Sequence, residues 1–252
     1  MVAAEPEGDG WALVMRDVSA QLIAPTATLT RAQAHCVLAA MWAMYDRFWG
    51  SDLRGLCGLA DRLTFHSPAV AARERQRAHP VPAVYGLDYF AAIQRGWELF
   101  ADDAPKDVAA AVLGLLDDPG PLVAELSRAK ATLNHGDLKY ANLGLTADRV
   151  ILLDWGTFTG MAPPAVDFAW FLLQNAARID ASHEDLIADF RELSTDRFDE
   201  RALQLALVGA LLQLGWRRAL GAAQAPDEAE RVATRAELRW WYQRAQVALD
   251  HW

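Results

Sequence analysis

Cysteine and lysine are both scarce in this chain. Its 252 residues contain two cysteines, Cys36 and Cys57, too few for a disulfide framework at this size, and no CxxC metal or redox pattern occurs. A reducing, cytoplasmic location is therefore predicted. Only Lys106, Lys130 and Lys139 are lysines among 24 basic residues, which limits the residues that could grip a phosphate group.

Long apolar runs and low-complexity tracts are also missing. The longest apolar helix candidate, residues 202–216, falls short of the roughly 20 residues that span a bilayer, so we expect a buried helix and no membrane partner. Residues 1–10 hold proline, glycine and three acids without an apolar block, which predicts a flexible leader without strands. The net charge of -9 argues against nucleic acid as a partner. This charge is compatible with a cationic substrate but does not require one.

The composition that remains, 53% hydrophobic and 23% charged, is typical of a folded globular domain. Residues 11–18 predict one strand that enters a turn, and two β-rich runs, 141–145 and 149–155, predict a small hairpin. Helical spacing predicts helices on both sides of that hairpin, at 31–49, 88–101, 106–116, 121–131, 165–179, 182–193, 198–220 and 226–251. The fold class is therefore α+β, mostly α, with one domain over residues 11–252.

One stretch, "HGDLKYANLGLTADRVILLDWG" from His135 to Gly156, carries the chemistry. Asp137 and Asn142 are five residues apart, so a tight loop can turn both toward one point, and Asp154 ends an apolar strand. Carboxylate and amide oxygens suit Mg²⁺ that also keeps waters and substrate phosphates. The implied reaction is phosphoryl transfer, in which one aspartate receives the proton of an acceptor hydroxyl.

The segments "HGDLKYAN" and "LLDWG" resemble the catalytic loop and metal-binding aspartate of the aminoglycoside phosphotransferase and choline kinase-like family, small-molecule relatives of protein kinases. The resemblance implies ATP as co-substrate, Asp137 as catalytic base, Asn142 and Asp154 as Mg²⁺ ligands, and His135 as an organiser of the loop. It also implies a fold like the large C-terminal lobe of a kinase, with a small β-hairpin at the catalytic loop.

Two flanking segments extend the resemblance. "GMAPPAVDFAWFL" is similar to the segment in which an acid at the start of a helix supports the loop, which implies that role for Asp167; a plain helix-terminal acid is the alternative. "WALVMRDVSA" is similar to the hinge between the lobes, whose backbone at Met15, Arg16 and Asp17 would bind adenine, although Arg16 departs from the acid often found there. Lys139 could touch the transferred phosphate or only neutralise Asp137.

A complete member of the family carries a small β lobe before the hinge, with a lysine that grips the nucleotide phosphates. Only about ten residues precede this hinge, and they contain no lysine. The N-terminal lobe is therefore expected to be absent, with two readings. Either this is a kinase whose small lobe comes from another chain, a lost upstream segment or a homodimer, or it is a non-catalytic remnant that binds a small molecule or protein. In both readings the surface near Met15 to Val18 should be apolar.

The acceptor hydroxyl is weakly specified. Relatives phosphorylate aminoglycosides, amino alcohols and sugars. Two groups of residues could bind a cation: the acids Asp180, Glu184, Asp185, Asp189 and Glu192, and the aromatic run Trp240, Trp241 and Tyr242. The alternatives are a solvated helix face for the acids and core packing for the aromatics.

Overall fold

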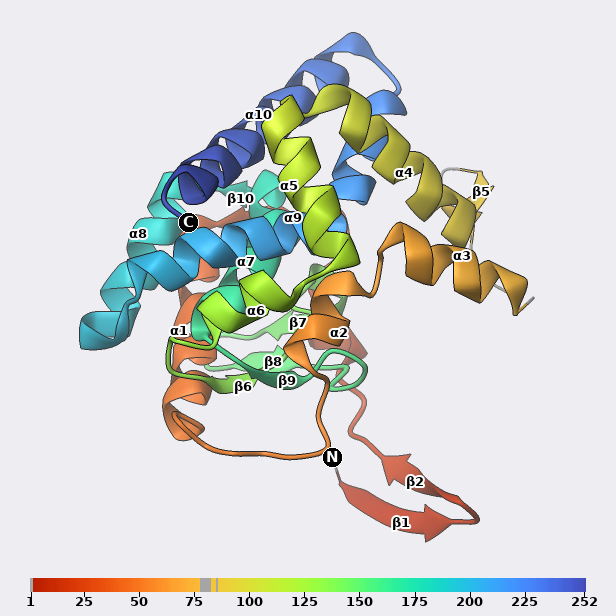
Figure 1. The fold of residues 1–252 in the computed structure, drawn as a ribbon. Coiled ribbons are helices and arrows are strands. Elements are labelled where there is room, and N and C mark those ends of the chain that lie inside the picture. Colours follow the sequence, from red (N-terminus) through yellow and green to blue (C-terminus); the bar gives the residue numbers. More distant parts are fainter. Residues whose placement is uncertain (1, 78–82, 85) are drawn as a thin grey trace.

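The computed structural model describes residues 2–77, 83–84 and 86–252, and helices make up most of it (Figure 1). The α-helices are α1 (Arg31–Arg47), α2 (Leu59–Thr64), α3 (Pro68–Gln76), α4 (Tyr89–Asp103), α5 (Lys106–Asp117), α6 (Gly120–Leu126), α7 (Pro164–Asn175), α8 (His183–Ser194), α9 (Glu200–Ala223) and α10 (Glu228–Asp250). The mostly helical α+β class is confirmed. The sequence did not predict α2 and α3, which are short, and α3 is rich in charge.

The strands are short and form pairs. They are β1 (Ala3–Glu7), β2 (Gly10–Val14), β3 (Leu29–Thr30), β4 (Ala83–Val84), β5 (Leu87–Asp88), β6 (Thr132–Asn134), β7 (Leu143–Leu145), β8 (Val150–Leu152), β9 (Gly160–Ala162) and β10 (Ile179–Asp180). The pairs are β1–β2, β4–β5, β6–β9 and β7–β8, all antiparallel, and the parallel pair β3–β10. The predicted hairpin is β7–β8, and the Thr146 amide closes its turn on the Arg149 carbonyl at 3.0 Å.

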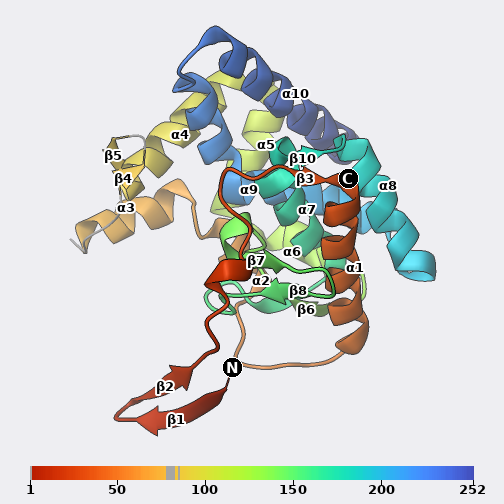
Figure 2. The ribbon, with the colours of Figure 1, turned by 180° about the vertical axis from the view of Figure 1, so that it is seen from behind.

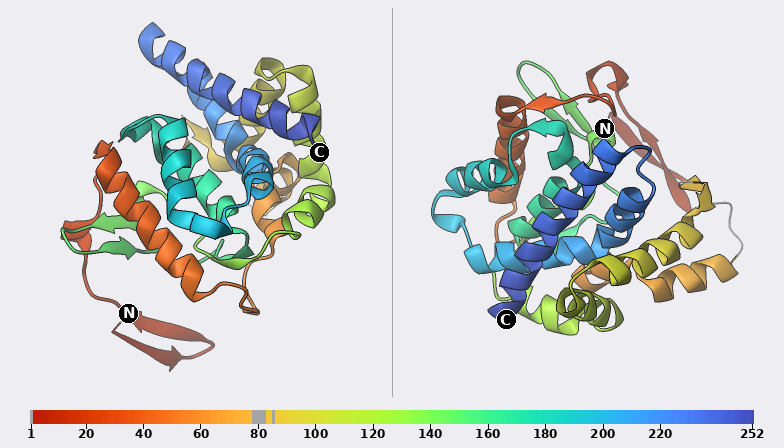
Figure 3. Two further views of the ribbon diagram at one scale, coloured as in Figure 1. Left: turned by 90° about the vertical axis from the view of Figure 1, so that its left-hand side faces the viewer. Right: turned by 90° about the horizontal axis from the view of Figure 1, so that it is seen from above.

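Helix α9 lies at the centre of the helical part, against α4, α7 and α10 (Figures 1 and 3). It is buried along most of its length, as its nearly all-apolar sequence predicts. Glycine permits the close crossing with α4, since a Cβ at Gly96 would lie 2.3 Å from the Trp216 carbonyl oxygen. This crossing places Trp216 against α4, and its ring lies 5.9 Å from that of Tyr89 at the start of the helix.

The N-terminal hairpin β1–β2 projects away from the helices (Figures 2 and 3). The expectation of a leader without strands is wrong for Ala3–Glu7, which pairs along β2. In this register Leu13 lies opposite Ala4 and Trp11 opposite Pro6, so one face of the hairpin is apolar. Met1 lies outside the described residues.

The hairpin exposes large apolar side chains. Trp11, Leu13, Val14 and Met15 are 67%, 59%, 55% and 65% exposed. The exposed apolar side chains lie mostly on β2, ahead of the expected segment Met15 to Val18, where Met15 is exposed, Arg16 and Asp17 are charged and Val18 is half-buried. The segment Ala3–Glu7 pairs with β2 without covering these side chains. No helix in the described part of the chain is both long and apolar enough to cross a membrane.

Candidate active site

The loop between β6 and β7 holds Asp137 in a defined orientation. Its Oδ2 accepts hydrogen bonds from Lys139 Nζ at 2.5 Å and from Asn142 Nδ2 at 3.0 Å. The same Asn142 amide also donates to the Asp137 carbonyl at 2.8 Å. Within the described residues no hydrogen bond occupies Asp137 Oδ1, so one carboxylate oxygen is fixed and the other is left for a ligand.

His135 connects this loop to the strand that precedes Asp154. Its Nδ1 accepts from the Asp137 amide at 3.2 Å, so its Nε2 carries the proton and donates to the Leu153 carbonyl at 2.7 Å. The imidazole is buried and packs against Trp155, with 4.5 Å between ring centroids. His135 therefore holds the loop and the end of β8 together and does not point at a ligand.

Asp167, in the first turn of α7, lies beneath the loop and is fully buried. Its two oxygens accept from the backbone amides of His135 at 2.7 Å and Gly136 at 2.8 Å. The loop needs glycine at position 136, where φ is +91° and a Cβ would lie 2.2 Å from the Phe158 carbonyl oxygen. Asp167 thus fixes the backbone on which Asp137 is mounted.

A buried arginine that the sequence did not single out completes this network. Arg62 in α2 is 2% exposed, and its guanidinium donates to Asp167 at 3.2 Å and to Gln213 at 3.2 Å. The Tyr45 hydroxyl approaches Asp167 at 3.4 Å. Burial raises the Tyr45 pKa, and the Asp167 charge raises it further. No local signal marks Arg62, because its partners are about 100 and 150 residues away in the chain.

Asp154 follows β8 with a left-handed backbone, φ +63°. The preceding Leu153 amide donates to the Asn142 carbonyl at 2.9 Å, which places Asp154 one residue beyond the point where the hairpin meets Asn142. Its side chain is exposed. Asn142 and Asp154 therefore lie at the same end of the β7–β8 hairpin, beside Asp137.

The oxygens of Asn142 and Asp154 suit Mg²⁺. Asn142 directs both hydrogen bonds of its nitrogen toward Asp137, which leaves its Oδ1 for a cation. The described residues contain no group of three or more His, Cys, Asp or Glu side chains that could hold a metal alone. A cation here would depend on ligand oxygens from a bound phosphate.

The expected hinge residues Met15, Arg16 and Asp17 connect β2 to the short 3-10 helix Ser19–Gln21. Asp17 binds the Ser19 amide at 2.9 Å and hydroxyl at 2.6 Å, and these hydrogen bonds lower its pKa. A few residues later the Ile23 amide donates to the Leu143 carbonyl at 2.9 Å. The segment therefore enters the domain along β7, next to the hairpin that carries Asp154.

No family model and no curated protein matches this chain. Solved structures do match it, and small-molecule kinases are among them. A choline kinase of Streptococcus pneumoniae is 15% identical, with 89% of this chain and 67% of that chain covered and a TM-score of 0.45. An aminoglycoside phosphotransferase of Alicyclobacillus acidocaldarius is 15% identical, with 86% of this chain and 64% of that chain covered and a TM-score of 0.47. A choline/ethanolamine kinase family protein of Mesorhizobium loti is 14% identical, with 90% of this chain and 70% of that chain covered and a TM-score of 0.44.

The same choline kinase also matches in a complex with AMP, at 16% identity and a TM-score of 0.45. The chain spans about two thirds of the length of these structures. With every TM-score below 0.5, the likeness gives neither a family nor an activity for this chain. The absence of an N-terminal lobe and the roles of the site residues stay predictions.

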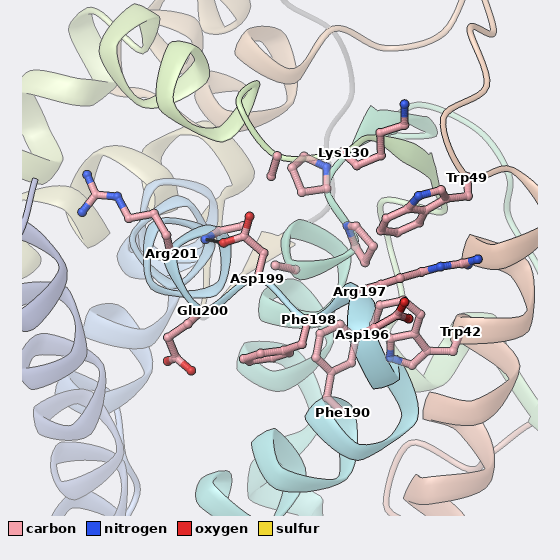
Figure 4. Close-up of a pocket in the computed structure, with 15 residues that line it drawn as sticks. Trp42, Trp49, Lys130, Phe190, Asp196, Arg197, Phe198, Asp199, Glu200 and Arg201 are labelled. Carbon is pink, nitrogen blue, oxygen red and sulfur yellow. Dashed lines mark hydrogen bonds between the residues drawn. The ribbon is translucent and has the colours of Figure 1, made fainter.

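A cavity of about 560 Å³ lies apart from these residues (Figure 4). Its walls are aromatic, with Trp42, Trp49, Phe190 and Phe198 among them. Arg197 there is paired with Asp46 and lies over the Trp49 ring at 4.9 Å. None of the predicted site residues lines this cavity.

Three of the five acids considered for a cationic acceptor are held in ion pairs, whereas no hydrogen bond or ion pair within the described residues engages the side chains of Asp180 and Glu192. Asp185 and Asp189 bind Arg31 at 2.8 and 2.7 Å, and Glu184 binds Arg244 at 2.5 Å. Trp241 and Tyr242 are buried in the core, whereas Trp240 stacks on His183 with 4.1 Å between centroids. The run of three aromatics therefore forms no cage.

A wall of aromatic side chains that the sequence did not reveal lies next to the loop. His66 Nε2 and the Tyr89 hydroxyl are 2.7 Å apart, and the rings of Phe158 and Trp216 lie 6.3 and 5.8 Å from the His66 ring. Burial lowers the His66 pKa to about 4, so the ring is neutral near pH 7. Phe158 reaches the loop directly, because its carbonyl packs against Gly136.

Proposed function

We propose that this chain is the large lobe of a phosphotransferase that moves a phosphoryl group from ATP to a hydroxyl of a small molecule. The observation that carries the proposal is the orientation of Asp137. Lys139 and Asn142 hold Oδ2, the buried Asp167 holds the loop, and Oδ1 is left to accept the proton of the hydroxyl. A base within hydrogen-bond reach of its substrate is the geometry that phosphoryl transfer needs.

Asn142 and Asp154 would hold Mg²⁺ against the phosphates of the nucleotide. The ion would neutralise charge on the transferred group. Lys139 is bound to Asp137, which favours a neutralising role over contact with the phosphate. The backbone at Met15 to Asp17 would bind adenine, since no hydrogen bond within the described residues occupies the backbone of Met15 or Arg16.

The chain alone is expected to be a poor catalyst. Lys106 begins α5, Lys130 packs its side chain near Gly50, and Lys139 binds Asp137, so no lysine is placed to grip the α and β phosphates. We propose that a second chain or a second copy supplies this clamp. The runner-up is a non-catalytic remnant, but a binding remnant has no need for Asp137, Asn142 and Asp154 together.

Thermal unfolding with nucleotide tests the proposal. Mg²⁺ alone should do little, whereas 1 mM ATP with Mg²⁺ and a Kd of about 0.1 mM would stabilise the fold by roughly 1.4 kcal/mol, a few degrees in Tm. Asp154→Ala should abolish the shift and Asp137→Ala should retain it, because Asp137 meets the acceptor. No shift in the wild type would favour the remnant, and a shift that survives Asp154→Ala would place the nucleotide elsewhere.

A further inference from the structure

The cavity of about 560 Å³ has a continuous wall of four aromatic rings (Figure 4). The Trp49 and Trp42 ring centroids are 6.5 Å apart, those of Trp42 and Phe190 are 5.1 Å apart, and those of Phe190 and Phe198 are 6.4 Å apart. Favourable ring pairs have centroid separations of about 4.5–7 Å. A further ring placed against this four-ring wall would therefore continue the same packing.

Small apolar residues complete the lining. They are Pro163, Pro164 and Ala165, at the start of α7, and Ala129, which follows α6. The first turn of α7 also contains Asp167, which binds the loop that carries Asp137. The cavity is therefore separate from Asp137 but adjoins the helical turn that holds its loop.

The charged side chains of the lining balance one another. They are the cations Lys130, Arg197 and Arg201 and the acids Asp196, Asp199 and Glu200. Arg197 is paired with Asp46, and Arg201 approaches Glu125 at 3.7 Å. In Figure 4 the Lys130 amine points away from the four-ring wall. The cations are therefore not directed at the space beside the rings.

The three acids are engaged as well. Glu200 binds Arg191 at 2.8 Å. Asp199 caps α9 by accepting from the Ala202 amide at 2.8 Å, and Asp196 accepts from the neighbouring threonine hydroxyl at 3.1 Å. With equal numbers of cations and acids in the lining, neither sign of charge is favoured in a ligand. What the cavity offers is its apolar and aromatic surface.

We propose that this cavity is a binding site for an uncharged, planar aromatic molecule of one or two fused rings. The site is separate from the proposed phosphoryl-transfer site. The ligand ring would lie against Trp42, Phe190 and Phe198, and it would gain from burial of apolar surface and from ring–ring contact. A charged ligand would lose hydration that the balanced lining does not replace. The volume lies within the range of about 300–1,000 Å³ that is usual for ligand pockets.

Fluorine NMR on the full chain tests the site with three probes that share one ring system. 5-Fluoroindole is uncharged, 5-fluoroindole-3-acetate carries a negative charge and 5-fluorotryptamine carries a positive charge. 5-Fluoroindole should bind with a Kd of about 0.1–1 mM, as expected for roughly ten non-hydrogen atoms. Both charged probes should bind at least tenfold more weakly.

Two variants locate the bound ring. Phe198→Ala removes one ring of the wall, and Ala129→Phe adds a ring from a half-buried position in the lining. Each should weaken 5-fluoroindole binding at least tenfold. Phe90→Ala is the matched control, because Phe90 is a half-buried phenylalanine of α4 outside this lining. It should bind 5-fluoroindole as the wild type does, and thermal melts check that each variant is folded.

Three results would overturn the inference. They are no binding of 5-fluoroindole, tighter binding of either charged probe, and a folded Ala129→Phe that binds as the wild type does. An equal loss of affinity in Phe90→Ala and Phe198→Ala would also overturn it, because the loss would then not be specific to this cavity. If Phe198→Ala fails to fold, Ala129→Phe decides, since it removes no ring from the wall.

Discussion

The loop that carries Asp137 and the N-terminal hairpin differ in how much of each is buried and held by other residues. In the loop, Asp137 and His135 are buried; Lys139 and Asn142 of the same loop hold the Asp137 carboxylate, and His135 binds the Leu153 carbonyl after β8. In the hairpin, Trp11 and Leu13 are mostly exposed and β1 and β2 pair only with each other. The loop is therefore held by contacts on every side that the described residues provide, whereas the apolar side chains of the hairpin are left uncovered.

The loop and the hairpin should also contribute very differently to the free energy of unfolding. The loop depends on the buried ion pair of Arg62 and Asp167, where the loss of one partner leaves a desolvated charge without compensation. An isolated two-stranded hairpin is marginal in water and adds little to the core. Substitutions at the loop should therefore cost far more than substitutions in the hairpin.

The largest effect is expected at Asp167. Asp167→Ala leaves the buried Arg62 charge without its carboxylate partner and leaves the His135 and Gly136 amides without an acceptor. The free energy of unfolding should therefore fall by about 3–5 kcal/mol. Chemical denaturation measures this loss. The matched control is Glu98→Ala, which breaks the exposed pair with Arg95 and should cost no more than about 0.5 kcal/mol. Similar losses in both variants would mean that the buried network does not hold the loop.

Acid should lower the free energy of unfolding, because His66, which packs beside the loop, must be protonated. Its folded pKa of about 4 lies below the ordinary histidine pKa of 6.5, so the unfolded chain binds more protons between these values and stability is lost as pH falls from 6.5 through 4. Between pH 7 and pH 4.5 the wild type should lose about 2 kcal/mol more than His66→Gln. Denaturant midpoints at several pH values measure the difference. Parallel pH profiles for both proteins would show that His66 titrates normally in the fold.

Two glycines give a matched test of backbone strain. Gly136→Ala forces a Cβ against the Phe158 carbonyl at a positive φ and should cost about 1–3 kcal/mol. Gly114 is exposed in α5, with nothing within 4 Å of an added Cβ. Gly114→Ala should instead raise the free energy of unfolding by about 0.5–1 kcal/mol. Thermal melts of both variants show the two signs. A neutral Gly136→Ala would mean that the loop can shift without cost.

Local patterns in the sequence predicted the loop residues because their arrangement is local. Asp137 and Asn142 are five residues apart, and the apolar run before Asp154 is a strand whose hairpin returns to Asn142. Arg62, Tyr45 and His66 could not be predicted in this way, because only the tertiary fold brings them to the loop. The missed strand β1 has a similar cause: proline and two glutamates within it hide its alternation.

The smallest effect on stability, and the clearest effect on association, is expected at the hairpin. Its apolar face bears Trp11 and Leu13 opposite Pro6 and Ala4, and two such faces can pair because each is complementary to itself. The double variant Trp11→Ser with Leu13→Ser should change the free energy of unfolding by under about 0.5 kcal/mol. In sedimentation velocity the wild type should show a dimer that grows with concentration, and the variant should stay monomeric. The matched control is Glu7→Ser, on the other face of β1, which should associate as the wild type does. A wild type that stays monomeric at all concentrations would indicate that a different chain covers this face, and a large loss of stability in the variant would contradict the separation of the two regions.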